Sequence, residues 1–168
     1  MDVPIGLFLR ILNPIISPIT SFFFHKPRLY VEFLDKGNSS GAEPNNSYRF
    51  TWRHELRVIN NSNYDAYNLK VDEPLSKSFD RIEQLPKLNN LEKRQHIILK
   101  TSKTAIIDND IGNKMRRGEL PHLFPPGCEE FALLLEYENE KGRTFYTLFN
   151  FTSGVGTNVL YFKKPVAK

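Results

Sequence analysis

The sequence predicts an all-β protein, built as an antiparallel sandwich of two sheets. Its 168 residues include 13 Phe, 7 Tyr and 1 Trp, which are residue types enriched in strands. Several segments alternate apolar and polar residues with a period of two, as half-buried strands do. Turn sequences separate these segments, and no helical periodicity lies between them. A chain of this length buries enough surface to fold as one domain without a disulfide or a metal.

The clearest alternation defines a strand from Tyr48 to Val58, whose apolar face also carries Trp52 and His54. A polar loop is predicted before it, at residues 38–46, and an Asn-rich turn follows at residues 60–63. The other predicted strands lie at residues 29–34, 67–71, 95–101, 131–137 and 143–151. A seventh strand is predicted within residues 78–85, and residues 159–168 are predicted as an edge strand or a tail.

Four short patterns resemble bacterial immunoglobulin-like modules of the CARDB type, over residues 48–152. They are Leu56-x-Val58-x-Asn60-Asn61-Ser62, Ala66-x-Asn68-Leu69-x-Val71, Leu88…Leu91, and Tyr137 before an acidic, Gly-containing hairpin. The resemblance implies an immunoglobulin-like antiparallel two-sheet sandwich that serves as an interaction or spacer domain without a cofactor. The chain departs from the family at Glu92-Lys93, where a Gly-containing turn is usual, and in a long insertion at residues 102–127.

An apolar helix is predicted before the sandwich, over residues 1–26, with the sandwich at 27–162 and a basic tail at 163–168. Between Val3 and Phe24 the only ionisable residue is Arg10, and about 22 helical residues span about 33 Å, enough to cross a bilayer core. Its polar residues form one narrow stripe, consisting of Arg10, Asn13, Ser17 and Thr20. The helix is therefore predicted to cross a membrane, to lie on it, or to pack on protein, with prolines at 14 and 18 favouring kinks.

The insertion at residues 102–127 is predicted to carry a second interaction surface. Lys114, Arg116 and Arg117 form a basic cluster, and Phe124 adds an apolar anchor. Such a loop contacts acidic groups or lipid phosphates in one interpretation, and is a solvated basic loop in the other.

No catalytic, metal-binding or cofactor-binding residue is predicted. The four histidines lack ligand spacing, and His54 is interpreted as a core or interface residue. The segment 108–112 lacks the glutamate of a calcium-binding EF-hand loop, which favours a polar loop with a helix cap. Cys128 precedes two glutamates that raise a thiol pKa, so a nucleophile is not predicted. The outward residues Arg49, Arg53 and Arg57 are interpreted as a solvated sheet face, because Glu55 lies among them and no aromatic residue is interleaved for nucleic-acid binding.

These observations predict a non-enzymatic interaction module that binds a protein partner and is tethered to a membrane by residues 3–24. Lys26 and Arg28, which follow the apolar run, place the sandwich on the cytoplasmic side. The net charge of +4 is interspersed, and neither nucleic acid nor a small-molecule substrate is indicated. The alternative is a soluble cytoplasmic subunit of a larger complex, whose N-terminal helix packs into another chain.

Overall fold

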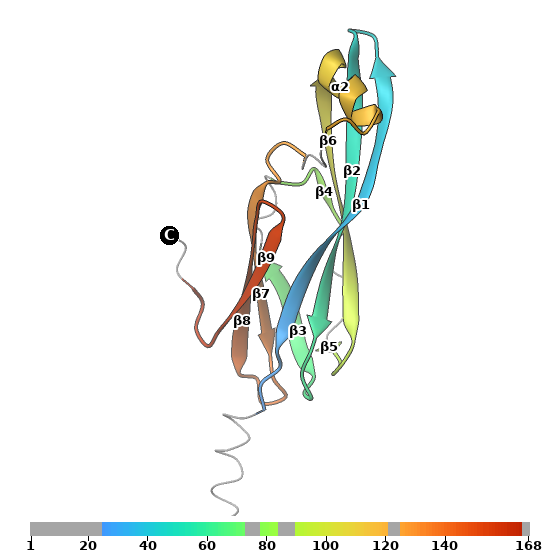
Figure 1. Cartoon of the computed structure of the whole chain (residues 1–168). Coiled ribbons are helices and arrows are strands. Elements are labelled where there is room, and N and C mark those ends of the chain that lie inside the picture. Colours follow the sequence, from blue (N-terminus) through green and yellow to red (C-terminus); the bar gives the residue numbers. More distant parts are fainter. Residues whose placement is uncertain (1–24, 73–77, 84–89, 121–124, 166–168) are drawn as a thin grey trace, which may run out of the picture.

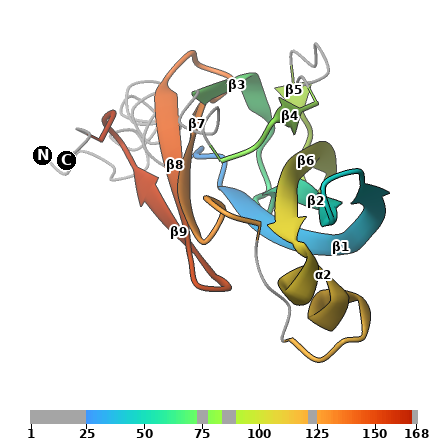
Figure 2. The same ribbon diagram turned by 90° about the horizontal axis from the view of Figure 1, so that it is seen from above.

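The fold consists of two antiparallel sheets that face each other, as Figures 1 and 2 show. The computed structural model describes residues 25–72, 78–83, 90–120 and 125–165. Sheet A has the strand order β1-β2-β6-β4 and contains β1 (Leu29–Glu43), β2 (Ser47–Asn60), β6 (His96–Asp108) and β4 (Arg81–Ile82). Sheet B has the order β5-β3-β7-β8-β9 and contains β5 (Asn90–Leu91), β3 (Ala66–Asp72), β7 (Glu130–Glu138), β8 (Thr144–Thr152) and β9 (Val155–Tyr161). The predicted all-β class with two antiparallel sheets is confirmed, and the predicted N-terminal helix at residues 3–24 lies outside the described residues.

The predicted strands are found, and two of them run further than predicted. β1 continues to Glu43 through a bulge between Asp35 and Asn38, so the prediction of a polar loop at residues 38–46 is wrong for residues 38–43 and holds only for the turn at residues 44–46. Likewise β6 continues to Asp108, well into the segment predicted as an insertion, and is followed by the helix α2 (Asn109–Arg116). Both extensions pair with β2. The side chains of the β1 extension are largely exposed and lack the burial alternation that identifies a strand from sequence, whereas those of the β6 extension alternate only between partly exposed and exposed.

The core lies between the two sheets, and the face of β2 that was predicted to be apolar is buried in it. Leu56 and Val58 are 0% exposed and His54 is 2% exposed. Sheet B contributes Leu133 and Leu135 from β7, which are also 0% exposed. Each such side chain contributes about 1.5–3 kcal/mol through removal of apolar surface from water, so this layer supplies most of the drive for the sheets to associate.

Sheet A extends beyond sheet B as a three-stranded arm of β1, β2 and β6, which is seen at the top of Figure 1. On the arm's inner face Phe50 and Trp52 remain 1% and 3% exposed. The helix α2 packs against β2 and β6 there. Asp108 caps α2, because its carboxylate accepts a hydrogen bond from the Asp110 amide at 2.9 Å. The helix cap predicted in segment 108–112 is therefore confirmed, but the polar loop predicted with it is wrong, because residues 109–112 belong to α2.

Gly112 allows α2 to approach the arm. A Cβ atom at this position would lie 2.5 Å from Cδ2 of Tyr48 and 3.2 Å from its Cβ, so the tyrosine cannot avoid it by a change of rotamer alone. We expect Gly112→Ala to lower the free energy of unfolding by about 1–3 kcal/mol through overpacking, although alanine favours a helix by about 1 kcal/mol. Urea denaturation measures the change. Gly41→Ala is the control, because a Cβ atom added at that exposed position would have no other atom within 4 Å.

Side chains of sheet B hydrogen-bond to the backbone of β1 where the two sheets approach each other. The Asn158 side chain accepts from the Val31 amide at 2.8 Å and donates to the Val31 carbonyl at 2.9 Å. Deeper in the core, the Thr147 hydroxyl donates to the Leu29 carbonyl at 2.9 Å. These contacts satisfy backbone groups of β1 that do not pair with β2, and they link the two sheets at one edge.

Candidate functional site

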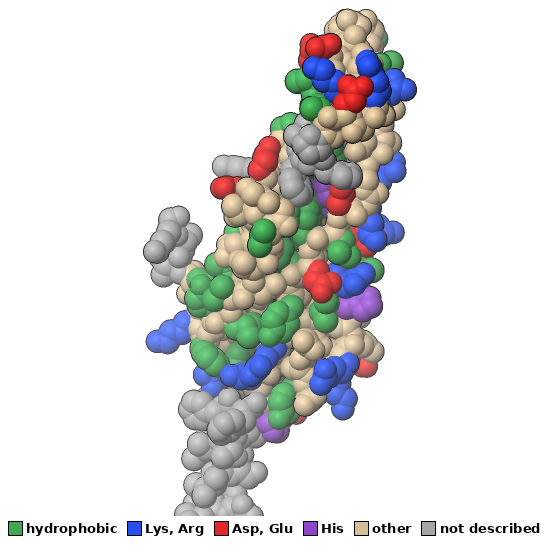
Figure 3. Space-filling model, in the orientation of Figure 1, with side chains coloured by type: hydrophobic (Ala, Val, Ile, Leu, Met, Phe, Trp, Pro, Cys, Tyr) green, Lys and Arg blue, Asp and Glu red, His purple; other side chains and the backbone are tan. Residues whose placement is uncertain are grey.

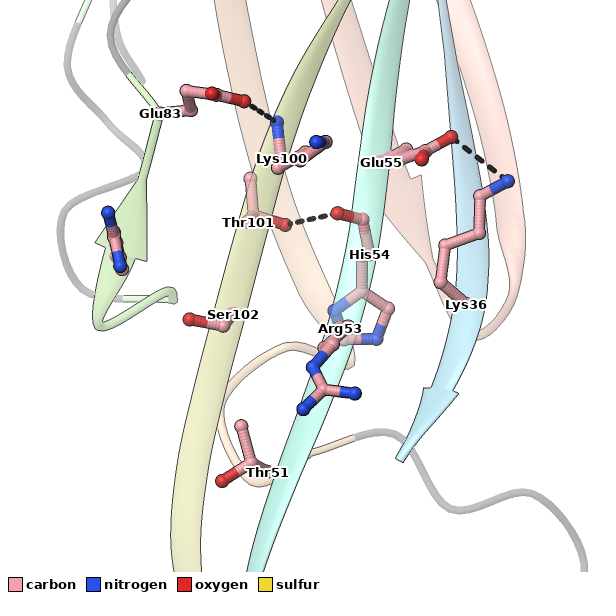
Figure 4. A pocket seen from close by; sticks show the side chains of 10 residues that line it. Lys36, Thr51, Arg53, His54, Glu55, Glu83, Lys100, Thr101 and Ser102 are labelled. Carbon is pink, nitrogen blue, oxygen red and sulfur yellow. Dashed lines mark hydrogen bonds and ion pairs between the residues drawn. The ribbon is translucent and has the colours of Figure 1, made fainter. Parts of the chain in front are cut away.

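A groove crosses the outer face of sheet A, the face turned away from sheet B (Figure 4). Its cavity volume is about 510 Å³, and its walls come from all four strands. We call it the outer-face groove; its lining residues are Lys36, Thr51, Arg53, His54, Glu55, Arg81, Glu83, Lys100, Thr101 and Ser102. The lining contains four cationic side chains, not counting His54, and two carboxylates. The groove is therefore positively charged.

Strand pairing brings two arginines together in the groove. Ser102 on β6 lies directly opposite Arg53 on β2 and directly opposite Arg81 on β4. Directly paired residues of antiparallel strands point to the same face, with Cβ atoms about 4.5–5.5 Å apart. The three residues, which we call the arginine row, therefore form one line across three strands. Figure 4 shows Arg53 and Ser102 from this line, with Thr51 beside them.

The neighbouring row of the groove is electrically balanced. Lys36 and Glu55 form an ion pair at 3.0 Å, and the Glu55 side chain is only 18% exposed. Glu83 accepts a hydrogen bond from the Lys100 amide at 3.3 Å. Both groove carboxylates are therefore already engaged, the first by a lysine ammonium and the second by backbone.

The two arginines of the arginine row are not paired in this way. Within the described part of the chain, neither the Arg53 nor the Arg81 guanidinium makes a hydrogen bond or an ion pair. By contrast, Arg49 pairs with Glu43 at 2.8 Å and Arg57 pairs with Glu32 at 3.5 Å, on the same face of β2. Two uncompensated guanidiniums on either side of a hydroxyl can bind an oxyanion, because guanidinium donates paired hydrogen bonds to carboxylate and phosphate.

The side chains of the basic cluster predicted from the sequence mainly contact other residues of the same chain. Arg116 donates to the Tyr48 hydroxyl at 3.1 Å and stacks on the tyrosine ring, with 5.1 Å from its guanidinium carbon to the ring centroid. Lys114 lies 3.8 Å from Asp110, and Arg117 lies 3.4 Å from Glu119. These contacts support α2 and its C-terminal turn. The other predicted interaction residues, Arg10, Asn13, Ser17, Thr20 and Phe124, lie outside the described residues.

His54 is a core histidine, as predicted from its place on the apolar face of β2. Its ring stacks on Phe33 at a centroid distance of 4.8 Å, and its Nδ1 atom has no hydrogen-bond partner within the described residues. Burial lowers the pKa of His54 below its ordinary value of 6.5, and the Asp35 carboxylate partly opposes this shift. The side chain is therefore held neutral, against the interior of the sandwich.

The lowered pKa of His54 makes stability depend on pH. Between that pKa and 6.5, the unfolded chain binds more protons at this position than the folded chain does. The neutral His54 ring therefore makes its full contribution to the free energy of unfolding above pH 6.5, and this contribution is lost as pH falls through the lowered pKa. We expect His54→Phe, which retains ring stacking and removes the unpartnered nitrogen, to show a smaller fall in stability between pH 7.5 and pH 5 than wild type. Urea midpoints at a series of pH values measure this. Thr152→Val, which changes an exposed and non-titrating residue of β8, is the control and should keep the wild-type pH dependence.

Cys128 is buried, and its thiol donates to the Ser78 carbonyl. Burial raises the pKa of this thiol to about 11, with Lys103 opposing the shift and Glu129 and Asp80 adding to it. The predicted direction is confirmed, but burial is the largest cause, and of the two glutamates only Glu129 contributes. At neutral pH the sulfur is protonated, a form that is a poor nucleophile.

A second exposed surface lies on sheet B. Apolar side chains gather over the region of β8 and β9 in Figure 3. The exposed apolar residues of β9 lie on both of its faces: Val155 and Val159 pair with outward residues of β8, and Leu160 pairs with the buried Thr147. Phe162 accepts cation–π contacts from Lys26 and Arg143, at 5.3 and 5.5 Å from its ring centroid. This surface lies on the outer strand of sheet B and is separate from the outer-face groove.

Comparisons with known proteins give no relative for this chain: no family model matches it, and no curated protein or solved structure does. In the described ranges, no helix is both long and apolar enough to span a bilayer. The same ranges bring no three His, Cys, Asp or Glu side chains together as a set of metal ligands.

Proposed function

We propose that the protein is a non-enzymatic interaction module that binds a protein partner through the outer-face groove of sheet A. The observation that carries this proposal is the arginine row, in which neither Arg53 nor Arg81 makes an ion pair or a hydrogen bond with another described residue. Arginine is enriched at protein interfaces and often dominates their binding energy. The groove also lies on a sheet that is supported on its opposite face, which keeps the arginines in a fixed arrangement.

The proposed class of domain is an immunoglobulin-like sandwich of the CARDB type. The strand order supports it, because β1-β2-β6-β4 corresponds to the order A-B-E-D of that architecture, and β3-β7-β8 corresponds to C-F-G. β9 is then an additional strand beside the last one. Domains of this architecture serve many unrelated functions, so the function has to be argued from the groove itself.

The membrane tether at residues 3–24 belongs to the same proposal, with the sandwich on the cytoplasmic side. The chain enters the described structure at the end of the sandwich opposite the arm (Figure 1), so a tether there would hold the arm away from the membrane and leave sheet A accessible. The alternative is a subunit whose N-terminal helix packs into another chain. Detergent dependence tests the tether: a full-length protein that is soluble and monodisperse without detergent or partner contradicts it.

Site-specific photo-cross-linking in the native cells tests the partner-binding role. A photoreactive phenylalanine analogue replaces Thr51, which lines the groove, and in a second variant it replaces Lys70, whose side chain is 67% exposed on sheet B. We expect a discrete cross-linked protein from the Thr51 position and a much weaker one from the Lys70 position. Equal cross-linking from both positions, or none from Thr51, would contradict binding through the groove.

A further inference from the structure

We infer that the outer-face groove recognises a single carboxylate side chain in an extended and otherwise neutral peptide segment of the partner, and that the arginine row binds this carboxylate. The inference rests on the proposed function and specifies the chemistry of the partner. It assigns Arg53 and Arg81 as the charged contacts and the Ser102 hydroxyl as a neutral donor between them.

The spacing of the arginine row fits a single oxyanion. Two strand intervals separate Arg53 from Arg81, which places their Cβ atoms about 10 Å apart. An extended arginine side chain reaches about 6 Å beyond its Cβ, by ordinary covalent dimensions. Both guanidiniums can therefore reach an anion held above Ser102, and neither has to leave another described partner first.

The surroundings of the row favour a peptide carboxylate over a polyanion. Glu55 and Glu83 lie one row away along the strands, at about 7 Å for a two-residue step. Because Lys36 and Lys100 balance these carboxylates, this neighbouring row adds no net positive charge that would bind the successive phosphates of a nucleic acid or the headgroups of an anionic membrane, whereas a lone carboxylate needs only the arginine row. The outward residues of β2 from Arg49 to Arg57 include no aromatic side chain on which a base could stack.

Two exposed apolar residues lie along β6, one on each side of Ser102, and they indicate how long a bound peptide segment would be. Ile98 and Ile106 are 37% and 65% exposed, and each lies four residues from Ser102 on the outward face of β6. Four residues of strand span about 13 Å. An extended partner segment lying along β6 would therefore place apolar residues about four positions before and after its acidic residue.

A binding experiment with two matched peptides tests the inference on the full-length protein, in detergent where it is required. The glutamate peptide is the fluorescently labelled, capped sequence Leu-Ser-Thr-Ser-Glu-Ser-Thr-Ser-Leu, and the glutamine peptide replaces its Glu with Gln. Fluorescence anisotropy measures the dissociation constants for wild type, Arg53→Ala, Arg81→Ala and Arg49→Ala. Arg49 is the matched control, because it lies on the same face of β2 but is paired with Glu43.

We expect wild type to bind the glutamate peptide tenfold to a hundredfold more tightly than the glutamine peptide, as charge-assisted hydrogen bonds do. Arg53→Ala and Arg81→Ala should each lose at least tenfold, and Arg49→Ala should stay within about twofold. Equal binding of the two peptides, or unchanged binding by both groove variants, would overturn the inference. Displacement of the peptide by inorganic phosphate at a similar concentration would also overturn it, in favour of a site for small oxyanions.

The peptide experiment and the cross-linking experiment can reject the carboxylate site and the proposed function independently of each other. Partner cross-linking from Thr51 together with no binding of the glutamate peptide would reject the acidic segment and keep the interaction module. No cross-linking from Thr51 together with tight binding of the glutamate peptide would reject the protein partner and keep the carboxylate site.

Discussion

Asn158→Leu is expected to lower the free energy of unfolding by about 2–4 kcal/mol. The Asn158 amide makes two hydrogen bonds to the Val31 backbone, at 2.8 and 2.9 Å, and so replaces a strand pairing between β9 and β1. Leucine has nearly the same size but neither donates nor accepts, so the Val31 amide and carbonyl would lose both partners. Val31 itself is 1% exposed, which limits how well water can replace them.

Thermal and urea unfolding measure the effect of Asn158→Leu. For a domain of this size, the loss corresponds to a fall in Tm of about 5–12 °C. The control is Thr157→Val at the adjacent, exposed position of β9, where we expect a change within about 0.5 kcal/mol. A similar stability for Asn158→Leu and Thr157→Val would show that the side-chain link between the two sheets contributes little.

Thr147→Val should destabilise the protein by a comparable amount, about 2–4 kcal/mol. Thr147 is 0% exposed, and its hydroxyl donates to the Leu29 carbonyl and lies 3.1 Å from the Tyr137 hydroxyl. Valine preserves the shape but leaves the carbonyl unpaired in the core. Burial also raises the pKa of Tyr137, so its hydroxyl remains protonated and needs a partner at neutral pH.

A double-mutant cycle separates this network from simple packing. Thr147→Val, Tyr137→Phe and the double variant are compared by urea denaturation, with the exposed residue Thr152 changed to Val as the control. Because the two hydroxyls contact each other, the double variant should lose less than the sum of the single losses, by at least about 0.5 kcal/mol. Additive losses would mean that the two hydroxyls stabilise the core independently.

The fold was predictable where burial alternates along the chain. β2 is the clearest case, because Leu56, Val58 and His54 face the core while the residues between them are more exposed. The extension of β1 to Glu43 was not predictable in this way, since its polar residues show no alternation and gain strand structure by pairing with β2. Strand pairing depends on residues distant in sequence, and single-sequence periodicity does not record it.

The groove could be predicted only in part. The sequence indicates that Arg49, Arg53 and Arg57 share one strand face, and the structure agrees. It does not indicate that Glu43 and Glu32 neutralise the first and third of these while Arg53 has no such partner among the described residues. Arg81 lies on a two-residue strand with no periodic signal, so its place beside Ser102 follows from the register of β4 on β6 alone.

The most direct test of binding through the outer-face groove is capture of the cross-linked partner by full-length variants. Wild type, Arg49→Ala and the double variant Arg53→Ala/Arg81→Ala are immobilised at equal density, after matching thermal unfolding shows that each is folded. We predict that the double variant captures at least tenfold less partner than wild type, and that Arg49→Ala captures as much as wild type. Equal capture by all three proteins would contradict the groove as the binding surface.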